Sequence, residues 1–379
     1  MSDEIMVVAG EESGDMHAAN VIKVVQELND DLSFFGLGSN QMREAGVEII
    51  DDLTHLSSIG FIEPLKNIFF FLKLLKKLKN LMKERQPKAV FLVDYSGFNM
   101  RVAKIANKLS IPIVNYFPPS AWVWGKWRAK KMASYGAKIP AVLPMEAETY
   151  REVGAEVKYV GHPIVEMTET KLSAKEFKSK HELNNQHLIA LLPGSRTGEI
   201  DELFEPMLQS VELILKRQPE AIDFVLPVAE NISLNDLEQK INKASLPIKL
   251  IKGQAKEAMN AADVAITASG TATLEATCLF TPMVVIYKTG IINYFLAKLL
   301  VKVSHIALPN IVAGAEIVPE LLQGAANCHN IAREVLTIIN SESREKEIKK
   351  NLAEVKAKLA EENTIKEVAK FLLEAGGLK

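Results

Sequence analysis

The feature that most constrains the fold is an alternation of short apolar runs with amphipathic helical patterns along nearly all of the 379 residues. Each apolar run is too short for a helix, and its lack of alternating polar residues indicates a strand buried on both faces. Strands that alternate with helices in this way predict parallel α/β architecture. In the first half the expected strands are Ile5–Ala9, Phe34–Leu37, Ala89–Val93 and Ile111–Tyr116.

The pattern starts again in the second half, while the intervening stretch Glu169–Asn185 is polar and shows no strand pattern. We therefore expect two doubly wound domains, over residues 1–168 and 169–339, that face each other across a cleft. The helical, charged residues from about 340 to 379 are expected to pack back on the N-terminal domain or on a partner subunit. The expected strands of the second domain are Leu188–Leu192, Phe224–Pro227, Ile248–Ile251, Val264–Thr267 and Met283–Tyr287.

Composition narrows the classes of protein. A hydrophobic content of 48% excludes a disordered chain, and two cysteines cannot form a disulfide framework. The chain contains no His-x-His, His-Glu-x-x-His or Asp-x-Asp sequence, so we predict no metal and no other cofactor. Acidic residues near the N-terminus disfavour a signal peptide, and no apolar run is long enough to span a membrane, so we expect a cytoplasmic protein.

A glycine-rich turn follows the first expected strand and reads Gly10-Glu11-Glu12-Ser13-Gly14-Asp15. Its spacing differs from G-x-G-x-x-G, and its carboxylates would repel a dinucleotide pyrophosphate. Carboxylate and hydroxyl groups suit sugar hydroxyls better, which makes Gly10, Glu11, Ser13 and Asp15 candidates for a sugar or acceptor site. The alternative is that Ser13 or Asp15 only caps the following helix.

Asp94 ends the apolar run Ala89–Val93 and precedes Tyr95-Ser96-Gly97-Phe98-Asn99. A carboxylate at the carboxyl end of a buried strand faces the ligand side of such a sheet, where it can act as a general base. Asp94 is therefore the candidate catalytic residue, and Asn99 joins the candidates on the sugar side. Capping of the next helix by Asp94 is equally consistent with the sequence, and the two roles are compatible.

Two turns in the second half have the composition of anion sites at helix N-termini. The first contains Gly194, Ser195 and Arg196, and a P-loop lysine is missing from it. Each turn alone is also consistent with ordinary helix capping, but two in one domain favour a nucleotide diphosphate, with Arg196 on the phosphates and Glu275 on the ribose hydroxyls. The other candidates for this site are Ser269, Gly270, Thr271, Thr273, Asn310 and Glu320.

The segment Leu65–Lys83 carries six lysines and no acidic residue. On a helix the lysines occupy one arc and a wide apolar arc faces away from them, a pattern typical of helices that lie on anionic membranes. The alternative is a buried helix with a solvated lysine edge. The expected membrane contacts are Ile68, Phe69, Phe70, Phe71, Leu72, Leu74 and Leu75.

A second basic segment, Ala121–Arg128, adds tryptophans. Such a mixture also occurs in proteins that bind single-stranded nucleic acid. No recognisable RNA-binding module accompanies it, so we expect no nucleic-acid partner.

Taken together and in order, several of these segments resemble lipid-A-disaccharide synthase, from the N-terminus to about residue 325. The matching segments are Val7-Val8-Ala9-Gly10-Glu11-x-Ser13-Gly14-Asp15, Leu191-Leu192-Pro193-Gly194-Ser195-Arg196-x-x-Glu199-Ile200, Ser269-Gly270-Thr271-Ala272-Thr273-Leu274-Glu275 and Leu308-Pro309-Asn310. The resemblance implies an inverting glycosyltransferase with two Rossmann-like domains (GT-B). Such an enzyme joins UDP-2,3-diacylglucosamine to 2,3-diacylglucosamine 1-phosphate (lipid X), and gives lipid A disaccharide 1-phosphate and UDP without a metal.

The resemblance also implies roles for the candidates. Asp94 would deprotonate the 6-hydroxyl of the acceptor, Arg196 and the turn 269–271 would face the diphosphate, Glu275 the ribose, and Asn310 and Glu320 the same cleft. Peripheral attachment to the inner face of the inner membrane fits residues 65–83. A homodimer with an exchanged C-terminal segment fits the helical tail.

The chain departs from the family pattern on the acceptor side. Ser96 stands where proline is common, Pro118-Pro119-Ser120 where Ser-Pro-Gln is common, Glu12 where a small residue is usual and Met145 where Phe is usual. Acyl-chain preference is therefore open. Two alternatives also stay open: an enzyme like UDP-N-acetylglucosamine 2-epimerase, which needs no membrane face, and a non-catalytic sugar-nucleotide or lipid-binding protein, in which Asp94 would be dispensable.

Overall fold

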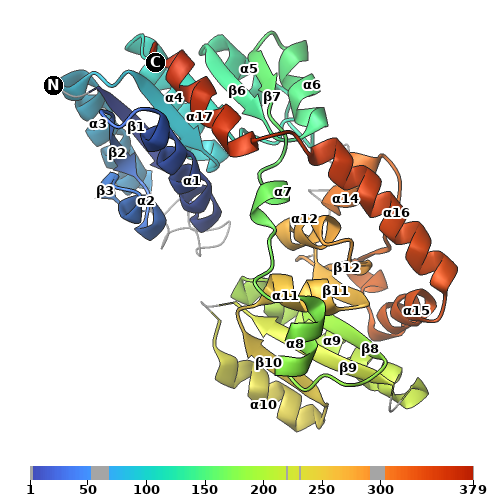
Figure 1. Cartoon of the computed structure of the whole chain (residues 1–379). Helices are drawn as coiled ribbons and strands as arrows, with labels where there is room; N and C mark the ends of the chain where they lie inside the picture. The colour runs from blue at the N-terminus through green and yellow to red at the C-terminus, as the bar shows by residue number, and fades with distance from the viewer. Residues whose placement is uncertain (1–2, 53–67, 219–220, 230–231, 291–303, 379) are drawn as a thin grey trace. The chain divides into compact units, whose positions relative to one another are not determined.

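The computed structural model describes residues 3–52, 68–218, 221–229, 232–290 and 304–378 (Figure 1). The chain forms two compact units: unit 1 comprises residues 1–163 and 360–379, and unit 2 comprises residues 164–359. Each unit is built on one sheet whose paired strands are parallel and whose connections are mostly helical. The prediction of two doubly wound α/β domains is confirmed.

The sheet of unit 1 has seven strands in the order β3-β2-β1-β4-β5-β6-β7. The order reverses beside β1, at the neighbouring strands β1 and β4, which is where doubly wound sheets bind ligands. The strands are β1 (Glu4–Ala9), β2 (Ser33–Leu37), β3 (Glu48–Asp51), β4 (Ala89–Val93), β5 (Ile113–Tyr116), β6 (Ala137–Ala141) and β7 (Glu156–Tyr159).

The helices of unit 1 cover both faces of its sheet. One hydrophobic core unites the sheet with α3, α4, α5 and α6, whereas α1 packs against α2 and α17 over the other face (Figure 1). Right-handed crossovers require this division, because the strand order runs in opposite directions from β1. The helices are α1 (Glu12–Leu28), α2 (Asn40–Glu44), α3 (Ile68–Arg85), α4 (Ser96–Lys108), α5 (Trp127–Ser134), α6 (Pro144–Glu152) and α17 (Thr364–Ala375).

The sheet of unit 2 has six strands in the order β10-β9-β8-β11-β12-β13. They are β8 (His187–Leu192), β9 (Ile222–Val228), β10 (Ile248–Lys252), β11 (Val264–Ala268), β12 (Met283–Tyr287) and β13 (Glu320–Leu322). The helices are α7 (Ile164–Met167), α8 (Ala174–Lys180), α9 (Thr197–Arg217), α10 (Leu234–Ala244), α11 (Ala255–Ala261), α12 (Thr271–Cys278), α14 (Leu308–Ala313), the 3₁₀ helix η3 (Gln323–Ala325), α15 (Cys328–Ile339) and α16 (Glu342–Leu359).

The C-terminal segment divides between the units. The expectation that residues 340–379 belong with the N-terminal domain is wrong for α16, which packs against α12, α14 and α15 in unit 2. Its side chains at i, i+4, i+7 and i+11 form a buried stripe that explains this packing: Ile348, Leu352, Val355 and Leu359. Only α17 returns to unit 1, where it contacts α1 and the strands β4, β5 and β6 (Figure 1).

The junction between the units also differs from the expectation. The boundary falls between Pro163 and Ile164, before the polar stretch 169–185. That stretch contains α8, which begins at a capping box formed by Ser173 and Glu176 and buries Phe177. Residues 169–185 are therefore an integral part of unit 2, since α8 packs on α11.

Candidate active site

Asp94 lies at the carboxyl end of β4 in a strained turn. Asp94 and the next residue, Tyr95, have φ angles of 51° and 52°, a left-handed conformation that non-glycine residues rarely adopt. Backbone strain of this kind persists only where surrounding contacts enforce it, and it clusters at functional sites. Here the Asp94 N–H donates to the Tyr116 carbonyl at 3.1 Å, and the Tyr95 N–H donates to Asp94 Oδ1 at 2.9 Å.

Asn99 stabilises this turn through its side-chain amide. Its amide Nδ2 donates to the Asp94 carbonyl and, at 3.4 Å, to the Val93 carbonyl. The side chain is 0% exposed, so the prediction that Asn99 contacts a sugar is wrong. Asn99 is a positioning residue that helps to enforce the left-handed backbone of Asp94.

The turn between β1 and α1 closes on Asp94. A Cβ atom on Gly10 would lie 2.3 Å from Cδ1 of Tyr95, so this position needs the small size of glycine, and one on Gly14 would make a tight approach of 3.3 Å to Cβ of Asp94. Ser13 Oγ donates to Asp94 Oδ2 at 3.3 Å. Glu11 is close enough to add to the effect of burial in raising the pKa of Tyr95. Thus Gly10, Glu11, Ser13 and Asp94 are brought together.

Asp15 belongs to a different structure. Its Oδ1 accepts from the Ser39 N–H at 2.5 Å and its Oδ2 from the Gln41 N–H at 2.9 Å, so it caps the N-terminus of α2. With 2% exposure it cannot reach a ligand, and its prediction as a sugar-side residue is wrong. Asp15 does cap a helix, as the alternative interpretation held, but the capped helix is α2 and not α1.

Two buried histidines lie near the same edge of the sheet and were not among the sequence candidates. The ring of Phe117, just after β5, stacks on His17 at a centroid distance of 4.4 Å and meets His162 edge-on at 5.6 Å. Burial lowers the pKa of His17 to about 4 and that of His162 to about 3, so both rings are neutral at physiological pH. His17 follows Ser13 by one helical turn, and that spacing is the signal that places both on one face of α1.

In unit 2 the two predicted turns lie at one edge of the sheet. They follow β8 and β11, which are neighbouring parallel strands, and lead into α9 and α12. Gly194 has φ +115°, and a Cβ atom there would lie 2.9 Å from Cβ of Glu199. Arg196 is the N-cap of α9 with its side chain 69% exposed and Nη1 3.2 Å from Glu199 Oε1. Adjacent helix N-termini beside an accessible arginine are an arrangement that is able to bind an anion.

The second turn is only partly available to a ligand. Gly270 and Thr271 are exposed, and Ser269 Oγ donates to the Ile306 carbonyl at 3.1 Å. Thr273 is 0% exposed, and its Oγ1 donates to the Gly270 carbonyl at 2.7 Å. The prediction that Thr273 contacts the diphosphate is therefore wrong, because its hydroxyl bonds within its own helix.

Asn310 and Glu320 form a hydrogen-bonded pair at the start of α14. Glu320 accepts from the N–H groups of Ile306 at 3.0 Å and Ala307 at 2.9 Å. Asn310 Nδ2 donates to Glu320 Oε1 at 2.7 Å, while its Oδ1 accepts from two backbone N–H groups. Asn310 is 0% exposed and the Glu320 side chain 6%, so the prediction of nucleotide contacts for both is wrong. Through the bond from the Ile306 N–H to Glu320, this pair positions the backbone whose carbonyl accepts from Ser269.

Glu275 lies on α12 and is partly exposed. Burial raises the pKa of its carboxyl, and nearby Lys256 opposes that change. The ribose contact predicted for Glu275 stays a prediction. So does the absence of a metal, although the described residues contain no group of three or more His, Cys, Asp or Glu side chains that could hold a metal ion.

Helix α3 divides the predicted membrane contacts into two groups. Phe69, Phe70 and Leu72 are 82%, 39% and 56% exposed. Leu74 is 3% exposed and part of the core, so its predicted membrane contact is wrong, and Phe71 and Leu75 are half-buried against the same core. Residues 65–67 and the Ile68 side chain lie outside the described residues. No helix in the described ranges is long and apolar enough to cross a membrane.

Comparison with solved structures places the fold. The UDP-GlcNAc 2-epimerase of Neisseria meningitidis bound to UDP-GlcNAc has a TM-score of 0.68 and 15% identity, over 98% of this chain and 100% of that chain. MurG of Acinetobacter baumannii has a TM-score of 0.61 and 13% identity, over 98% of this chain and 99% of that chain. These low identities show the shared GT-B fold alone, and they do not favour an epimerase.

Comparison of sequences is more specific. The lipid-A-disaccharide synthase of Anaeromyxobacter dehalogenans (strain 2CP-1 / ATCC BAA-258) is 38% identical over 375 residues, covering 98% of this chain and 97% of that protein. The protein of the same name from Syntrophus aciditrophicus (strain SB) is 36% identical over 357 residues, covering 94% of this chain and 93% of that protein. The family model described as lipid-A-disaccharide synthetase matches residues 5–375. The chain therefore belongs to the lipid-A-disaccharide synthetase family.

Proposed function

We propose that the protein is an inverting glycosyltransferase of lipid A biosynthesis. It transfers 2,3-diacylglucosamine from UDP to the 6-hydroxyl of 2,3-diacylglucosamine 1-phosphate and releases UDP. The observation that carries the proposal is the carboxylate of Asp94, held in a strained turn at the carboxyl end of β4 and bonded to Ser13. The match of the family model to residues 5–375 supports the same activity.

Asp94 supplies the base. Its carboxylate takes the proton of the acceptor 6-hydroxyl, and the oxygen attacks C1 of the donor sugar on the face opposite the diphosphate. The bond between C1 and the diphosphate oxygen breaks, and its electron pair leaves with UDP, so the configuration at C1 inverts. Hydrogen bonds from Ser13 and the Tyr95 N–H hold the carboxylate in one orientation, which lowers the entropic cost of proton transfer.

Unit 2 binds the nucleotide in this proposal. In the first turns of α9 and α12, the N–H groups of Glu199 and Thr273 donate to the N-cap carbonyls of Arg196 and Gly270. The N–H groups that precede them can donate to phosphate oxygens. Arg196 adds a full positive charge where the leaving diphosphate develops negative charge. Glu275 binds the ribose hydroxyls, and the reaction proceeds without a metal.

Unit 1 docks on a membrane through the exposed part of α3. Phe69, Phe70 and Leu72 provide apolar contact, and exposed lysines on the same helix provide attraction to anionic lipid: Lys73, Lys76, Lys77 and Lys79. We place the protein on the cytoplasmic, inner face of the inner membrane, where both acylated substrates partition. A homodimer with exchanged C-terminal segments is part of the same proposal.

Substitution of Asp94 tests the catalytic assignment. UDP release is measured with the diacylated UDP-sugar donor, with and without the monosaccharide 1-phosphate acceptor. Asp94→Asn should lose at least about two orders of magnitude in turnover, the contribution typical of a general base. UDP affinity in calorimetry should be unchanged. The matched control is Glu12→Gln, an exposed carboxylate on the neighbouring turn. Full turnover by Asp94→Asn would exclude the base role.

A further inference from the structure

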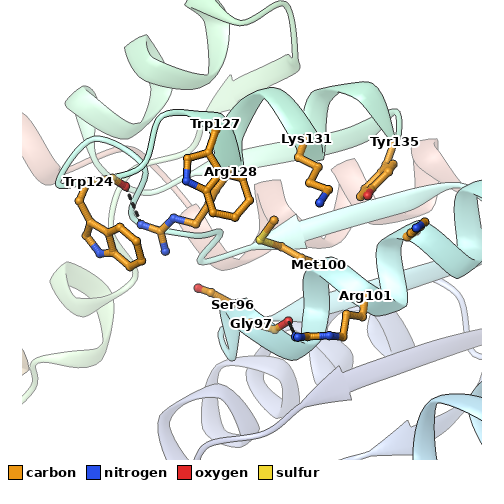
Figure 2. Close-up of a pocket in the computed structure, with 10 residues that line it drawn as sticks. Ser96, Gly97, Met100, Arg101, Trp124, Trp127, Arg128, Lys131 and Tyr135 are labelled. Carbon is orange, nitrogen blue, oxygen red and sulfur yellow. Dashed lines mark hydrogen bonds between the residues drawn. The ribbon is translucent and has the colours of Figure 1, made fainter. Parts of the chain in front are cut away.

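A groove of about 550 Å³ runs between α4 and α5 in unit 1 (Figure 2). It begins at Ser96 and Gly97, the first residues of α4, which directly follow the turn of Asp94 and Tyr95. One end of the groove is thus next to the proposed base. None of the roles assigned above uses the residues farther along it.

The groove is strongly positive. Four of the described residues that line it are cations and none is acidic; the cations are Arg101, Lys104, Arg128 and Lys131. By contrast, Lys126, which is not among the residues that line the groove, forms an ion pair with Glu152. Within the described ranges, none of the four cations has a carboxylate within 4.0 Å. Their charges are therefore available to an anionic ligand.

Arg128 is the most informative of the four because it is buried, with 8% exposure. Its Nη2 donates to the carbonyls of Trp124 at 2.7 Å and Ser120 at 3.2 Å, which fixes the guanidinium 3.9 Å over the Trp124 ring (Figure 2). Nε has no acceptor among the described residues. A buried cation that lacks a counter-charge is unfavourable, and an anion bound in the groove would supply one.

The walls of the groove are aromatic as well as basic. Trp124 is 41% exposed and Trp127 55%, and Met100 faces them across the groove (Figure 2). An inorganic anion would leave this apolar surface in water. A ligand with an acyl chain beside its anionic group would cover it.

The groove also lies on the side of the sheet that carries the exposed residues of α3. Helices α3, α4 and α5 share one hydrophobic core, and Phe71 of α3 contacts Phe98 of α4 at a ring distance of 5.8 Å. A lipid that arrives at Phe69 and Phe70 therefore reaches the groove along the same face of unit 1.

We propose that the groove between α4 and α5 binds the acceptor, an acylated sugar 1-phosphate. The phosphomonoester lies against Arg128, Arg101 and Lys131, and an acyl chain covers Trp124 and Trp127. This inference rests on the proposed function. The 6-hydroxyl and the 1-phosphate of one hexose leave its ring at different carbons, so a single acceptor can meet Asp94 and the groove together. In the donor the phosphate on C1 is joined through an anhydride to UMP and is not a monoester, so this contact distinguishes acceptor from donor.

The test compares two acceptors in two proteins. The acceptors are short-acyl diacylglucosamine with and without its 1-phosphate, and the proteins are the natural chain and Arg101→Ala/Lys131→Ala. Both substituted side chains are exposed, so the fold should persist. The KM for the phosphorylated acceptor should rise about ten- to a hundredfold in the variant, the scale of a lost charge-assisted contact, with the donor KM unchanged. Removing the phosphate should raise KM in the natural protein and change little in the variant.

Controls separate this inference from the proposed function. Lys108→Ala, an exposed lysine on α4 outside the groove, should leave the acceptor KM unchanged. Quenching of the groove tryptophans by either acceptor reports binding without turnover. A protein that binds the phosphorylated acceptor but releases no UDP would overturn the proposed function and support the groove.

Two results would overturn the inference. One is an equal effect of phosphate removal in both proteins. The other is a variant that loses affinity for anionic phospholipid vesicles while its acceptor KM stays unchanged, which would assign the cations to bilayer headgroups instead.

Discussion

At the scale of single residues, contacts with neighbouring side chains and backbone hold Asp94 and Tyr95 in their left-handed conformation. Asn99 bonds the Asp94 carbonyl from below, and the Tyr95 ring fills the space over Gly10. The strain is thus sustained by packing between two turns that are far apart in the sequence. A carboxylate fixed in this way needs little reorganisation when it accepts a proton.

Gly10 tests that argument. A Cβ atom at Gly10 would overlap the Tyr95 ring, so Gly10→Ala should lower the free energy of unfolding by about 1–3 kcal/mol and reduce turnover. The control is Gly198→Ala on α9, where no atom lies within 4 Å of the added methyl group and the helix should gain up to about 1 kcal/mol. Denaturant unfolding measures both. Equal stabilities for the two variants would contradict the close contact.

Glu146 provides a test by pH. The carboxyl is buried, accepts from the Val142 N–H at 3.0 Å, and has its pKa raised by burial to about 8. The folded state therefore holds this proton between the ordinary value of 4.5 and about 8, and the associated stability, fully present at low pH, is lost as pH rises through that range. Glu146→Gln keeps an acceptor without the charge. It should match the natural protein near pH 4 and exceed its stability above pH 8, by up to about 1.4 kcal/mol per pH unit between.

The matched control for Glu146 is the exposed Glu148. Glu148→Gln should leave the pH dependence of unfolding unchanged. Parallel curves of stability against pH for Glu146→Gln and the natural protein would show that the buried carboxyl does not titrate as argued.

The place of a candidate residue in the fold could be predicted from the sequence where that place depends on local position. Asp94 and Arg196 each follow a buried strand, and that position alone brings them to the ligand edge of a parallel sheet. It failed for Asp15, Asn99 and Asn310, because their hydrogen-bond partners are set by tertiary packing. A polar side chain that binds backbone and one that binds ligand look alike in a sequence. The sequence shows the cations that line the α4–α5 groove, but it does not show that they face the same groove.

At the scale of secondary structure, α3 combines the two alternatives that its sequence left open. Leu74, Leu78 and Met82 form a buried stripe, so one face of the helix belongs to the core, while Phe69, Phe70 and Leu72 project from its first turns. The apolar arc looked too wide for packing alone because it serves two surfaces. Periodicity could indicate the width of the arc but not where the core ends along it.

Serine substitutions separate these two surfaces. Phe69→Ser/Phe70→Ser/Leu72→Ser should leave the melting temperature nearly unchanged and abolish flotation with anionic vesicles. Leu74→Ser/Leu78→Ser should lower the free energy of unfolding by several kcal/mol, about 2–5 for each large buried side chain replaced by a small one. Binding of the natural protein should weaken as salt is raised, because lysines contribute. Undiminished flotation of the first variant would exclude α3 as the membrane contact.

The strands missed from the sequence have physical reasons. β3 and β7 are edge strands with exposed and half-exposed residues, so they lack the continuous apolar run of a central strand. β6 contains Lys138 and Pro140 within the sheet. β13 spans three residues and contains Glu320, whose carboxylate accepts from the Ala307 N–H just before α14. The central strands with an unbroken apolar run were predictable, because both of their faces are buried.

At the scale of the whole molecule, each unit brings candidate site residues from elements distant in the sequence to the carboxyl edge of its own sheet. The formal charge of −2 conceals a strongly basic region in unit 1, to which α3 and the segment 121–131 contribute. The sequence predicted two doubly wound domains because the alternation of strands and helices restarts at about residue 188. It did not predict the division of the C-terminal helices, since both α16 and α17 carry an apolar stripe.

The packing of α17 on unit 1 can be tested separately from unit 2. Leu372 is 0% exposed against unit 1, so Leu372→Asp should destabilise that unit by several kcal/mol, about 3–5 for an unpaired buried charge. UDP binding to unit 2 should persist in calorimetry. Lys366→Ala, exposed on the same helix, is the control. Loss of UDP binding in Leu372→Asp would show that the two units do not fold as separate cores.

The return of α17 to unit 1 has a consequence for biosynthesis. Because α17 follows all of unit 2 in the chain, the ribosome releases unit 2 before the last helix of unit 1 is available. Until then the apolar surface of α1 that α17 covers stays exposed, and domains otherwise tend to fold as units in N-to-C order. During that interval the matching helix of a neighbouring nascent chain can dock there instead, so polysomes are the setting in which exchanged dimers would form.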